Sequence, residues 1–535
     1  MTSGDHRTAE LDVVVVGAGF AGLYALHRFR SLGLRTRVFE AGGGVGGTWY
    51  WNRYPGARCD VESMEYSYQF SDELQQEWQW SQRYAPQAEI LRYLEHVADR
   101  FSLRPDIQLD TRVEAASWDR EKGRWGVRCS DGSRWNARFF VMATGCLSAV
   151  NMPEFPGRDS FHGPIYHTAR WPHDGVHFDG QRVGVIGTGS SGVQSIPLIA
   201  AEAAHLTVFQ RTPTWSIPAH NRALDPEEVR RVKETYPELR KNGAMQPFGF
   251  DTRSAETAAL DVSGEERQVE FEDRWRRGGL AFLGGYNDLV LSREANDTAA
   301  EFVRTKIRAI VENPAVAAKL TPATAVGCKR LCVDTDYYAT FNRDNVTLVD
   351  VSTEPIEEIT PAGIRTSAAE YGLDAIVFAT GFDAMTGALL AVDIRGRDGM
   401  TLKQKWAAGP RTYLGLSTAG FPNFFFVTGP GSPSVLTNMV PSIEQHVNWI
   451  SRLILHVIET GGRTIEARTD AENGWVDLVN EIGNLTIYPT CNSWYLGSNV
   501  PGKPRVFMPY LGFPDYVMRV DAIAANGYEG FEIGA

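Results

Sequence analysis

Cysteine, long apolar runs and surplus positive charge are all scarce in this chain of 535 residues, and each scarcity excludes a class of protein. The six cysteines follow no disulfide framework, so a disulfide-stapled secreted domain is excluded and reduced thiols are predicted. Cys328 and Cys332 have no further cysteine or histidine nearby, so no metal site is expected. No apolar stretch approaches the roughly 20 residues of a membrane span. The net charge of −12 argues against nucleic acid or an anionic membrane as partner.

These scarcities leave a soluble, cytoplasmic protein of several domains as the expectation. The first apolar run covers only residues 13–16 and ends at Gly17, which is too short for a signal peptide. A chain of this length exceeds what one hydrophobic core supports. The oligomeric state is not encoded in any pattern that we recognise, and a monomer fits the sequence.

A first glycine-rich unit lies near the N-terminus. A buried strand predicted over residues 11–16 enters Gly17-Ala18-Gly19-Phe20-Ala21-Gly22, and helical periodicity follows over residues 23–32. The three glycines suit a tight turn, the approach of a pyrophosphate and close packing of helix on strand. A second strand over residues 36–39 ends at Glu40, whose carboxylate suits a ribose hydroxyl and repels a 2′-phosphate. The unit predicts a site for FAD or NAD.

A second unit of the same kind begins at residue 182. A strand over 182–186 enters Gly187-Thr188-Gly189-Ser190-Ser191-Gly192, and a helix is predicted over 193–201. The following strand, 206–209, ends in Gln210-Arg211-Thr212 instead of an acid. An arginine at this position attracts a 2′-phosphate, which favours NADPH, although a solvated surface charge is the alternative. Together the units predict an α/β fold with two Rossmann-like dinucleotide-binding domains.

Two further motifs belong to neither unit. Between them lies a segment with the pattern Phe-x-Gly-x-x-x-His-x-x-x-Trp, formed by Phe161, Gly163, His167 and Trp171, which we interpret as a hinge between domains. A loop rich in glycine and aromatic residues follows the first unit and ends at Asp60. Its alternative interpretation is a packed surface loop. This loop includes Gly47, Thr48 and Trp49, and Tyr66 lies just beyond it.

With these motifs the chain resembles the type I Baeyer–Villiger monooxygenases along nearly its whole length. The Phe-x-Gly-x-x-x-His-x-x-x-Trp pattern, the aromatic loop and the segment Gly327-Cys328-Lys329-Arg330-Leu331 carry the resemblance beside the glycine-rich turns. It implies that FAD and NADPH are the cofactors, that Arg330 is catalytic and that Asp60 orients it. It also implies that Lys329 faces the 2′-phosphate and that Trp494 reaches the nicotinamide cofactor. Substrate contacts are implied, with loop packing as the alternative, for Cys146, Ser434, Val435, Leu436 and Met439.

The activity that the resemblance implies is oxygenation of a small-molecule ketone by O2 to an ester or lactone through a C4a-peroxyflavin, with sulfides as further substrates. A flavin monooxygenase that oxygenates nitrogen or sulfur, and a non-enzymatic NADPH sensor, are the alternatives. Aliphatic, cyclic, aryl and steroidal ketones all stay open. The expected division of the chain is FAD-binding domain 1–148, hinge and NADP-binding domain 149–222, helical insertion 223–327, NADP-binding domain 328–383 and FAD-binding domain 384–535.

Overall fold

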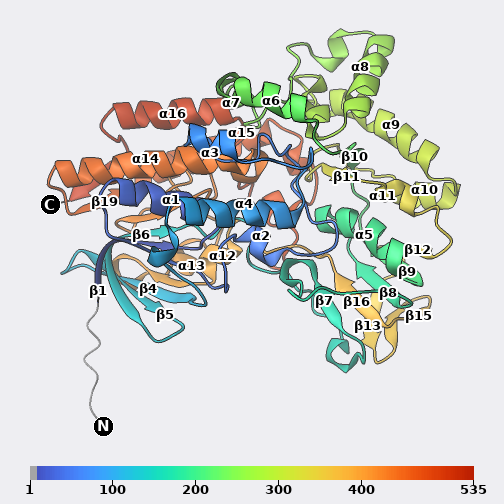
Figure 1. Cartoon of the computed structure of the whole chain (residues 1–535), viewed down its shortest axis with the longest axis horizontal. Helices are drawn as coiled ribbons and strands as arrows, with labels where there is room; N and C mark the ends of the chain where they lie inside the picture. The colour runs from blue at the N-terminus through green and yellow to red at the C-terminus, as the bar shows by residue number, and fades with distance from the viewer. Residues whose placement is uncertain (1–8, 535) are drawn as a thin grey trace.

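A computed structural model describes residues 9–534, and its two largest sheets occupy opposite sides of the molecule (Figure 1). The first sheet has the strand order β17-β4-β5-β6-β1-β2-β3, and β18 pairs with the end of β6. It therefore combines strands from both ends of the chain. Its strands are β1 (Ala9–Val16), β2 (Thr36–Phe39), β3 (Ile107–Gln108), β4 (Val113–Asp119), β5 (Arg124–Cys129), β6 (Arg134–Met142), β17 (Asp393–Arg395) and β18 (Phe424–Phe426).

The continuous apolar run of β1 follows from its central place in this sheet. Val13 and Val15 pack into one apolar cluster, whereas Val14 and Val16 pack into another on the opposite face. A parallel strand covered on both faces needs an apolar residue at every position. Helix α1 (Phe20–Ser31) covers one face and in turn packs against α14 (Met439–Glu459), which crosses above it in Figure 1. No helix within residues 9–534 combines the length and apolar character needed to cross a bilayer.

The second sheet is entirely parallel, with the order β12-β9-β8-β16-β7. Helix α5 (Ser190–Glu202) follows its strand β8, just as α1 follows β1. Both glycine-rich turns therefore lie at the carboxyl end of a central strand, which is where parallel sheets bind ligands. The strands are β7 (Ile165–His167), β8 (Arg182–Ile186), β9 (His205–Gln210), β12 (Val346–Asp350) and β16 (Ala375–Phe378).

The interpretation of residues 161–172 as a segment outside both units is wrong. Residues Ile165–His167 form β7, the edge strand of the second sheet, paired in parallel with β16. A Cβ on Gly163 would lie 2.2 Å from the carbonyl oxygen of Asp374, so this chain segment lies too close to β16 for any side chain there. Three residues of strand are too short to leave an alternation pattern, which is why the sequence did not indicate β7.

A helical insertion separates two short strands that pair with each other. Strands β10 (Ser216–Pro218) and β11 (Cys332–Asp334) run parallel, and the chain between them contains no strand. Local signals start these helices: Asp225 caps α6 ahead of Pro226, and Ser263 and Glu266 form a capping box on α8. The helices, along the top and upper right of Figure 1, are α6 (Pro226–Glu234), α7 (Tyr236–Ala244), α8 (Gly264–Arg277), α9 (Arg293–Ile310) and α10 (Pro314–Leu320).

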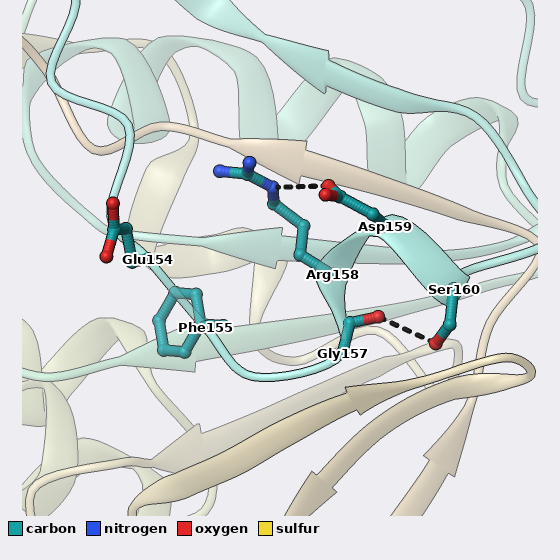
Figure 2. Close-up of a pocket in the computed structure, with 6 residues that line it drawn as sticks. All are labelled: Glu154, Phe155, Gly157, Arg158, Asp159 and Ser160. Atoms are coloured by element: carbon teal, nitrogen blue, oxygen red, sulfur yellow. Dashed lines mark hydrogen bonds and ion pairs between the residues drawn. The ribbon is translucent and has the colours of Figure 1, made fainter.

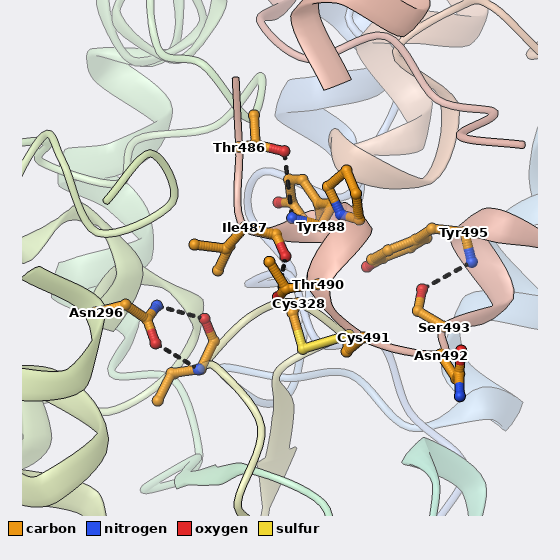
Figure 3. The surroundings of a disulfide bond; sticks show 12 residues. Asn296, Cys328, Thr486, Ile487, Tyr488, Thr490, Cys491, Asn492, Ser493 and Tyr495 are labelled. Carbon is orange, nitrogen blue, oxygen red and sulfur yellow. Dashed lines mark hydrogen bonds between the residues drawn. A yellow bond between two sulfur atoms is a disulfide. The ribbon is translucent and has the colours of Figure 1, made fainter. Parts of the chain in front are cut away.

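The prediction that all six cysteines are reduced is also wrong. Cys328 and Cys491 form a disulfide, with their Cα atoms 6.3 Å apart, while the other cysteines are free (Figure 3). The two positions lie 163 residues apart in the sequence. Only the tertiary fold brings them within disulfide range, so no local spacing could have indicated the bond.

Glu444 on α14 is a buried carboxyl that joins this helix to the segment before α3 (Asp72–Glu77). Its Oε1 accepts hydrogen bonds from the backbone N–H groups of Gln69 at 2.7 Å and Phe70 at 3.0 Å. Burial raises the pKa of Glu444 to about 7, and the two hydrogen bonds oppose the shift. The folded protein therefore holds a proton that the unfolded chain releases above pH 4.5, and the stability that this proton gives is lost as the pH rises through about 7.

We expect Glu444→Gln to raise the melting temperature at pH 8 and to leave it nearly unchanged at pH 4.5. The amide accepts the same N–H groups without a charge, so the gain in unfolding free energy at pH 8 is up to about 3 kcal/mol. Thermal unfolding of the purified wild type and variant at both pH values measures the change in melting temperature. Glu459→Gln, at the exposed end of the same helix, is the control and should change neither value. A lower melting temperature for Glu444→Gln at pH 8 would show that the carboxylate charge itself is needed.

Candidate active site

Both glycine-rich turns leave a helix N-terminus free of side-chain caps. Helix α1 begins after Gly19 and α5 after Gly189, and no acidic residue lies in either first turn. A Cβ on Gly189 would meet no atom within 4 Å, so the space in front of α5 is open. Unpaired N–H groups at a helix N-terminus attract anions. Both turns therefore fit the pyrophosphate of a dinucleotide.

The remaining glycines of the two turns are needed for close packing of strand and helix. A Cβ on Gly22 would lie 1.7 Å from the carbonyl oxygen of Gly17, and one on Gly192 would lie 2.5 Å from that of Gly187. Gly17 also has a φ of +101°, which favours glycine. The two units thus use their first and last glycines in the same way.

Glu40 lies at the predicted ribose position and also secures the first turn. Its Oε2 accepts a hydrogen bond from Ala18 N at 2.7 Å, and its Oε1 accepts one from Gly42 N at 2.8 Å. Burial raises the pKa of this carboxyl, and the two N–H groups oppose the shift. Each carboxylate oxygen keeps a second lone pair, so these bonds leave Glu40 able to accept from a ribose hydroxyl.

Arg211, Thr212 and Lys329 lie around the end of β9. Arg211 is exposed, and the carbonyl of Thr212 accepts a hydrogen bond from the Thr188 hydroxyl at 3.1 Å. Burial lowers the pKa of Lys329, and the nearby charge of Arg211 lowers it further. Within residues 9–534 neither cation forms an ion pair with an acidic side chain. Two neighbouring cations without an acid make a site that suits a phosphate.

The two serines of the second turn contact other parts of the chain. Ser191 Oγ lies 3.1 Å from the Thr168 hydroxyl, which follows β7, and Ser190 Oγ lies 3.4 Å from Cys332 Sγ on β11. The turn is therefore attached both to the edge strand of its own sheet and to the strand that follows Arg330.

Arg330 and Asp60 form a bidentate ion pair, although they lie 270 residues apart in the sequence. Nε and Nη2 of Arg330 donate to the two carboxylate oxygens at 2.8 and 2.7 Å, and Nη1 donates to the carbonyl of Val435 at 2.8 Å. Burial disfavours the guanidinium charge, but Asp60 outweighs it, and the pKa of Arg330 rises above its ordinary value. The arginine is therefore charged at every working pH and has a fixed direction.

The aromatic loop packs beside this pair. Gly47, with a φ of +53°, precedes the short helix α2 (Thr48–Trp51). The indole N–H of Trp49 donates to the Tyr66 hydroxyl at 3.2 Å, and both rings are largely buried. Tyr54 donates to Gln194 of α5 at 2.9 Å, which ties the loop to the second glycine-rich unit. Tyr54 is therefore the aromatic residue of this loop that links it to the second unit.

Four of the five predicted substrate residues share one apolar cluster with the predicted nicotinamide contact, Trp494. Its members include Cys146, Val435, Leu436, Met439 and Trp494. Ser434 is fully buried beside them, and its hydroxyl lies 2.9 Å from Cys146 Sγ. The structure thus brings together residues from three distant parts of the chain, and Val435 connects this cluster to Arg330 through its carbonyl.

His167 and Trp171 fix the segment that contains β7. His167 Nε2 lies 3.2 Å from the Thr380 hydroxyl, and its Nδ1 accepts a hydrogen bond from Ala169 N at 3.0 Å. Burial lowers the pKa of His167 to about 4, so the ring is neutral near pH 7. Trp171 is buried against Phe178, and the Phe161 ring lies against Gly163. All four pattern residues therefore pack within the second unit.

Sequence reasoning missed three contributors to the site. The Val435 carbonyl carries no signal, because any residue type supplies a carbonyl. Gln194 joins Tyr54 to α5, but one glutamine on a helix is not distinctive. Tyr495 is buried with its hydroxyl facing Arg330; burial raises the pKa of this phenol to about 12, and the guanidinium opposes the shift. Its only signal was its position next to Trp494.

A hollow of about 300 Å³ between Glu154 and Ser160 is separate from these residues (Figure 2). It is lined by one continuous stretch of chain, in which Arg158 donates to Asp159 and Ser160 donates to the Gly157 carbonyl. None of the residues predicted from the sequence to form a site lines this hollow. The candidate active site is therefore the region around Arg330, where the predicted residues meet.

Known proteins match the whole chain. Residues 14–274 match the pyridine nucleotide-disulphide oxidoreductase family model. A Baeyer–Villiger monooxygenase of Pseudooceanicola batsensis is 43% identical over 97% of this chain and 96% of its own. A phenazine N-monooxygenase of Lysobacter antibioticus is 41% identical over 98% of both chains. A solved steroid monooxygenase bound to NADP is 54% identical, with a TM-score of 0.94, over 98% of this chain and 100% of its own.

Solved structures that match along the full chain include complexes with both FAD and NADP, the two cofactors predicted from the sequence. Identity of this extent shows that the protein belongs to the Baeyer–Villiger monooxygenases, flavoenzymes that use FAD and NADPH to insert one oxygen atom of O2 next to a ketone carbonyl.

Proposed function

We propose that this protein oxygenates apolar ketones to esters or lactones at the guanidinium of Arg330. The observation that carries the proposal is the position of this guanidinium, which is fixed on one side by Asp60 and contacts the Val435 carbonyl of the apolar cluster on the other. A ketone in contact with the cluster would place its carbonyl oxygen near a permanent positive charge.

Arg330 would act by stabilising negative charge that develops on oxygen. When bound, NADPH and FAD would supply the electrons that activate O2, and O2 would supply the inserted oxygen atom. A fixed donor aimed at a developing oxyanion contributes about 3–4 kcal/mol to lowering a barrier. Asp60 would keep the guanidinium in this direction, and the rings of Trp49 and Tyr66 would exclude water from it.

The proposed cofactor contacts follow from the two glycine-rich units. FAD would lie on the first turn, with its ribose at Glu40 and the aromatic loop over it, and NADPH on the second, with its 2′-phosphate between Arg211 and Lys329. Trp494 would contact the nicotinamide end. The residues proposed to bind cofactor are Gly17, Gly19, Gly22, Glu40, Gly47, Thr48, Trp49, Asp60, Tyr66, Gly187, Gly189, Ser190, Ser191, Gly192, Arg211, Thr212, Lys329 and Trp494.

The proposed substrate is an apolar ketone, with thioethers as secondary substrates. Cys146, Val435, Leu436 and Met439 offer an apolar surface, and Ser434 is the one hydroxyl among the five predicted substrate residues. Steroid ketones are the first to test, because the solved relative that is 54% identical is a steroid monooxygenase.

We also propose the predicted division into FAD-binding, NADP-binding and inserted helical segments. Support comes from β17 and β18, which belong to the final segment yet pair with β4 and β6 of the first sheet. A cytoplasmic location and a monomeric state are proposed on the sequence alone.

The test is product formation from a panel of steroidal, aryl and cyclic ketones with NADPH and isotopically labelled O2. We expect an ester or lactone that contains one labelled oxygen atom, and NADPH consumption that rises with ketone concentration. An amine of matched size serves as the control, and a thioether of matched size tests the proposed secondary activity. Oxygenation of the amine without any ester would favour the nitrogen-oxygenating alternative, and NADPH binding without turnover on any compound would favour a sensor.

A further inference from the structure

The disulfide between Cys328 and Cys491 joins two segments that both reach the active site. Cys328 lies two positions before Arg330, and Cys491 lies three positions before Trp494. The bridge is buried in a small apolar cluster with Ala325 and Ile487. No step of the proposed reaction uses either sulfur, so the bond calls for a separate explanation.

The Cys328 side of the bridge is anchored to the helical insertion. Asn296, fully buried on α9, donates to the Val326 carbonyl at 2.9 Å and accepts from Val326 N at 2.8 Å (Figure 3). The same amide donates to the Leu289 carbonyl at 2.8 Å. After Arg330 the chain enters β11, which pairs with β10. The segment that carries Arg330 is therefore held at both ends.

The Cys491 side lies in a connection with little regular secondary structure. Between α15 (Thr469–Asn484) and α16 (Phe513–Ala525) the chain contains only two short 3-10 helices, Tyr488–Thr490 and Trp494–Leu496. A long connection without strands or α-helices is typical of a functional loop. This connection, residues 485–512, carries Trp494 and Tyr495, the side chains closest in sequence to Cys491 that belong to the active site.

We propose that Cys328–Cys491 is a reversible thiol–disulfide site, with a dithiol as its reductant, that limits how far the 485–512 connection can move away from Arg330. While the bond is intact, Cys491 stays within disulfide reach of the anchored segment. When it is reduced, the connection loses its covalent link to the anchored segment. Noncovalent contacts alone then hold it, such as the hydrogen bond from Ile487 N to the Val290 carbonyl at 2.9 Å, and Trp494 and Tyr495 can move away from the site together.

The surroundings of the bridge indicate which sulfur reacts. Cys328 is fully buried, whereas Cys491 is 6% exposed and lies between the exposed residues Thr490 and Asn492. A dithiol thiolate would attack Cys491 Sγ and release Cys328 as a thiolate, which takes up a proton. The second thiol of the reagent then closes its own disulfide and frees Cys491, so two electrons and two protons pass to the protein. An oxidised dithiol reverses the exchange.

The first test counts thiols in the purified holoenzyme. After unfolding without reductant, alkylation followed by mass spectrometry should label four cysteines, and all six after treatment with dithiothreitol. Peptide mapping should recover Cys328 and Cys491 as one linked pair. Six labelled cysteines in enzyme that was purified in air and without reductant would overturn the proposal.

The second test measures movement of the connection by hydrogen exchange in the holoenzyme with NADP+. In the oxidised protein Met508 N donates to the Tyr495 carbonyl at 3.1 Å, and Val506 N donates to that of Leu496 at 3.2 Å. After dithiothreitol these amides should exchange about tenfold faster, while those of β1 stay unchanged. Equal exchange before and after reduction would overturn the proposal.

Variants separate this effect from general effects of the reductant. Cys491→Ser and Cys328→Ala should exchange like the reduced protein and no longer respond to dithiothreitol. Cys129→Ala, which removes a free thiol in β5, should respond like the wild type. If a disulfide variant fails to fold, hydrogen exchange of the wild-type protein before and after dithiothreitol still tests the proposal. The exchange measurement does not depend on ketone oxygenation, so its failure and failure of the proposed function are distinguishable.

Discussion

Replacing Arg330 with alanine is expected to lower ester formation by about 10²–10³-fold while NADPH still reduces the bound flavin. The reason is that Arg330 is the charged group fixed beside the apolar cluster, whereas the glycine-rich turns that we propose as the cofactor sites are untouched. Anaerobic stopped-flow spectra measure flavin reduction, and chromatography of the products measures ester. NADPH that is oxidised without forming ester should yield hydrogen peroxide.

Three further variants show whether direction or charge matters. Arg330→Lys keeps the charge but cannot form the bidentate ion pair with Asp60, so most ester formation should still be lost. Asp60→Asn keeps the shape and removes the opposing charge, and we expect an intermediate loss. The control is Arg343→Ala, which removes an exposed arginine that follows Arg330 in the sequence, and this variant should behave like the wild type. Ester formation by Arg330→Ala within about twofold of wild type would contradict the assignment.

Arg211→Ala is expected to raise the KM for NADPH by about 10–100-fold and to leave the KM for NADH nearly unchanged. The 2′-phosphate distinguishes the two cofactors, and a charge-assisted hydrogen bond to it contributes about 1.5–3 kcal/mol. Steady-state kinetics with saturating ketone and oxygen, followed by the absorbance of the reduced nicotinamide, give both constants.

The control for this preference is an arginine of the same sheet that lies away from the turn. Arg182 begins β8 and pairs with Asp374 at 2.7 Å, so Arg182→Ala should leave the ratio of kcat/KM for the two cofactors unchanged. Lys329→Ala, like Arg211→Ala, should lower the ratio of kcat/KM for NADPH to kcat/KM for NADH. An unchanged ratio for Arg211→Ala would assign this arginine to the solvated surface.

The parts of the fold that could be predicted are those with a local cause. Three features leave a mark within a few residues: the buried run before Gly17, Gly22, where a Cβ would lie 1.7 Å from the Gly17 carbonyl oxygen, and the arginine that replaces an acid after β9. The pairing of Arg330 with Asp60 was not local. It followed from the resemblance to a known family, and the structure brings the two side chains together.

The rest depends on the tertiary fold. The Val435 carbonyl is invisible in the sequence, because the backbone is the same in every residue. Cys328 and Cys491 looked like isolated thiols because the chain between them folds into other units. The β7 strand is short enough that its pairing with β16, and not its own pattern, defines it. In each of these three cases the role of the residue or strand depends on the distant part of the chain that it contacts, and not on its own residue type.

The pairing of β18 with β6 has a consequence for how the chain folds during synthesis. Residues Phe140–Met142 of β6 emerge from the ribosome long before their partners Phe424–Phe426. Until then this edge of the first sheet has unpaired backbone groups and buried-type side chains, which is the kind of edge that pairs with other chains. All strands of the second sheet, by contrast, have emerged once residue 378 is made. The second sheet can thus mature first, while the first sheet must wait for the last third of the chain and is the part of the nascent protein that most needs a chaperone.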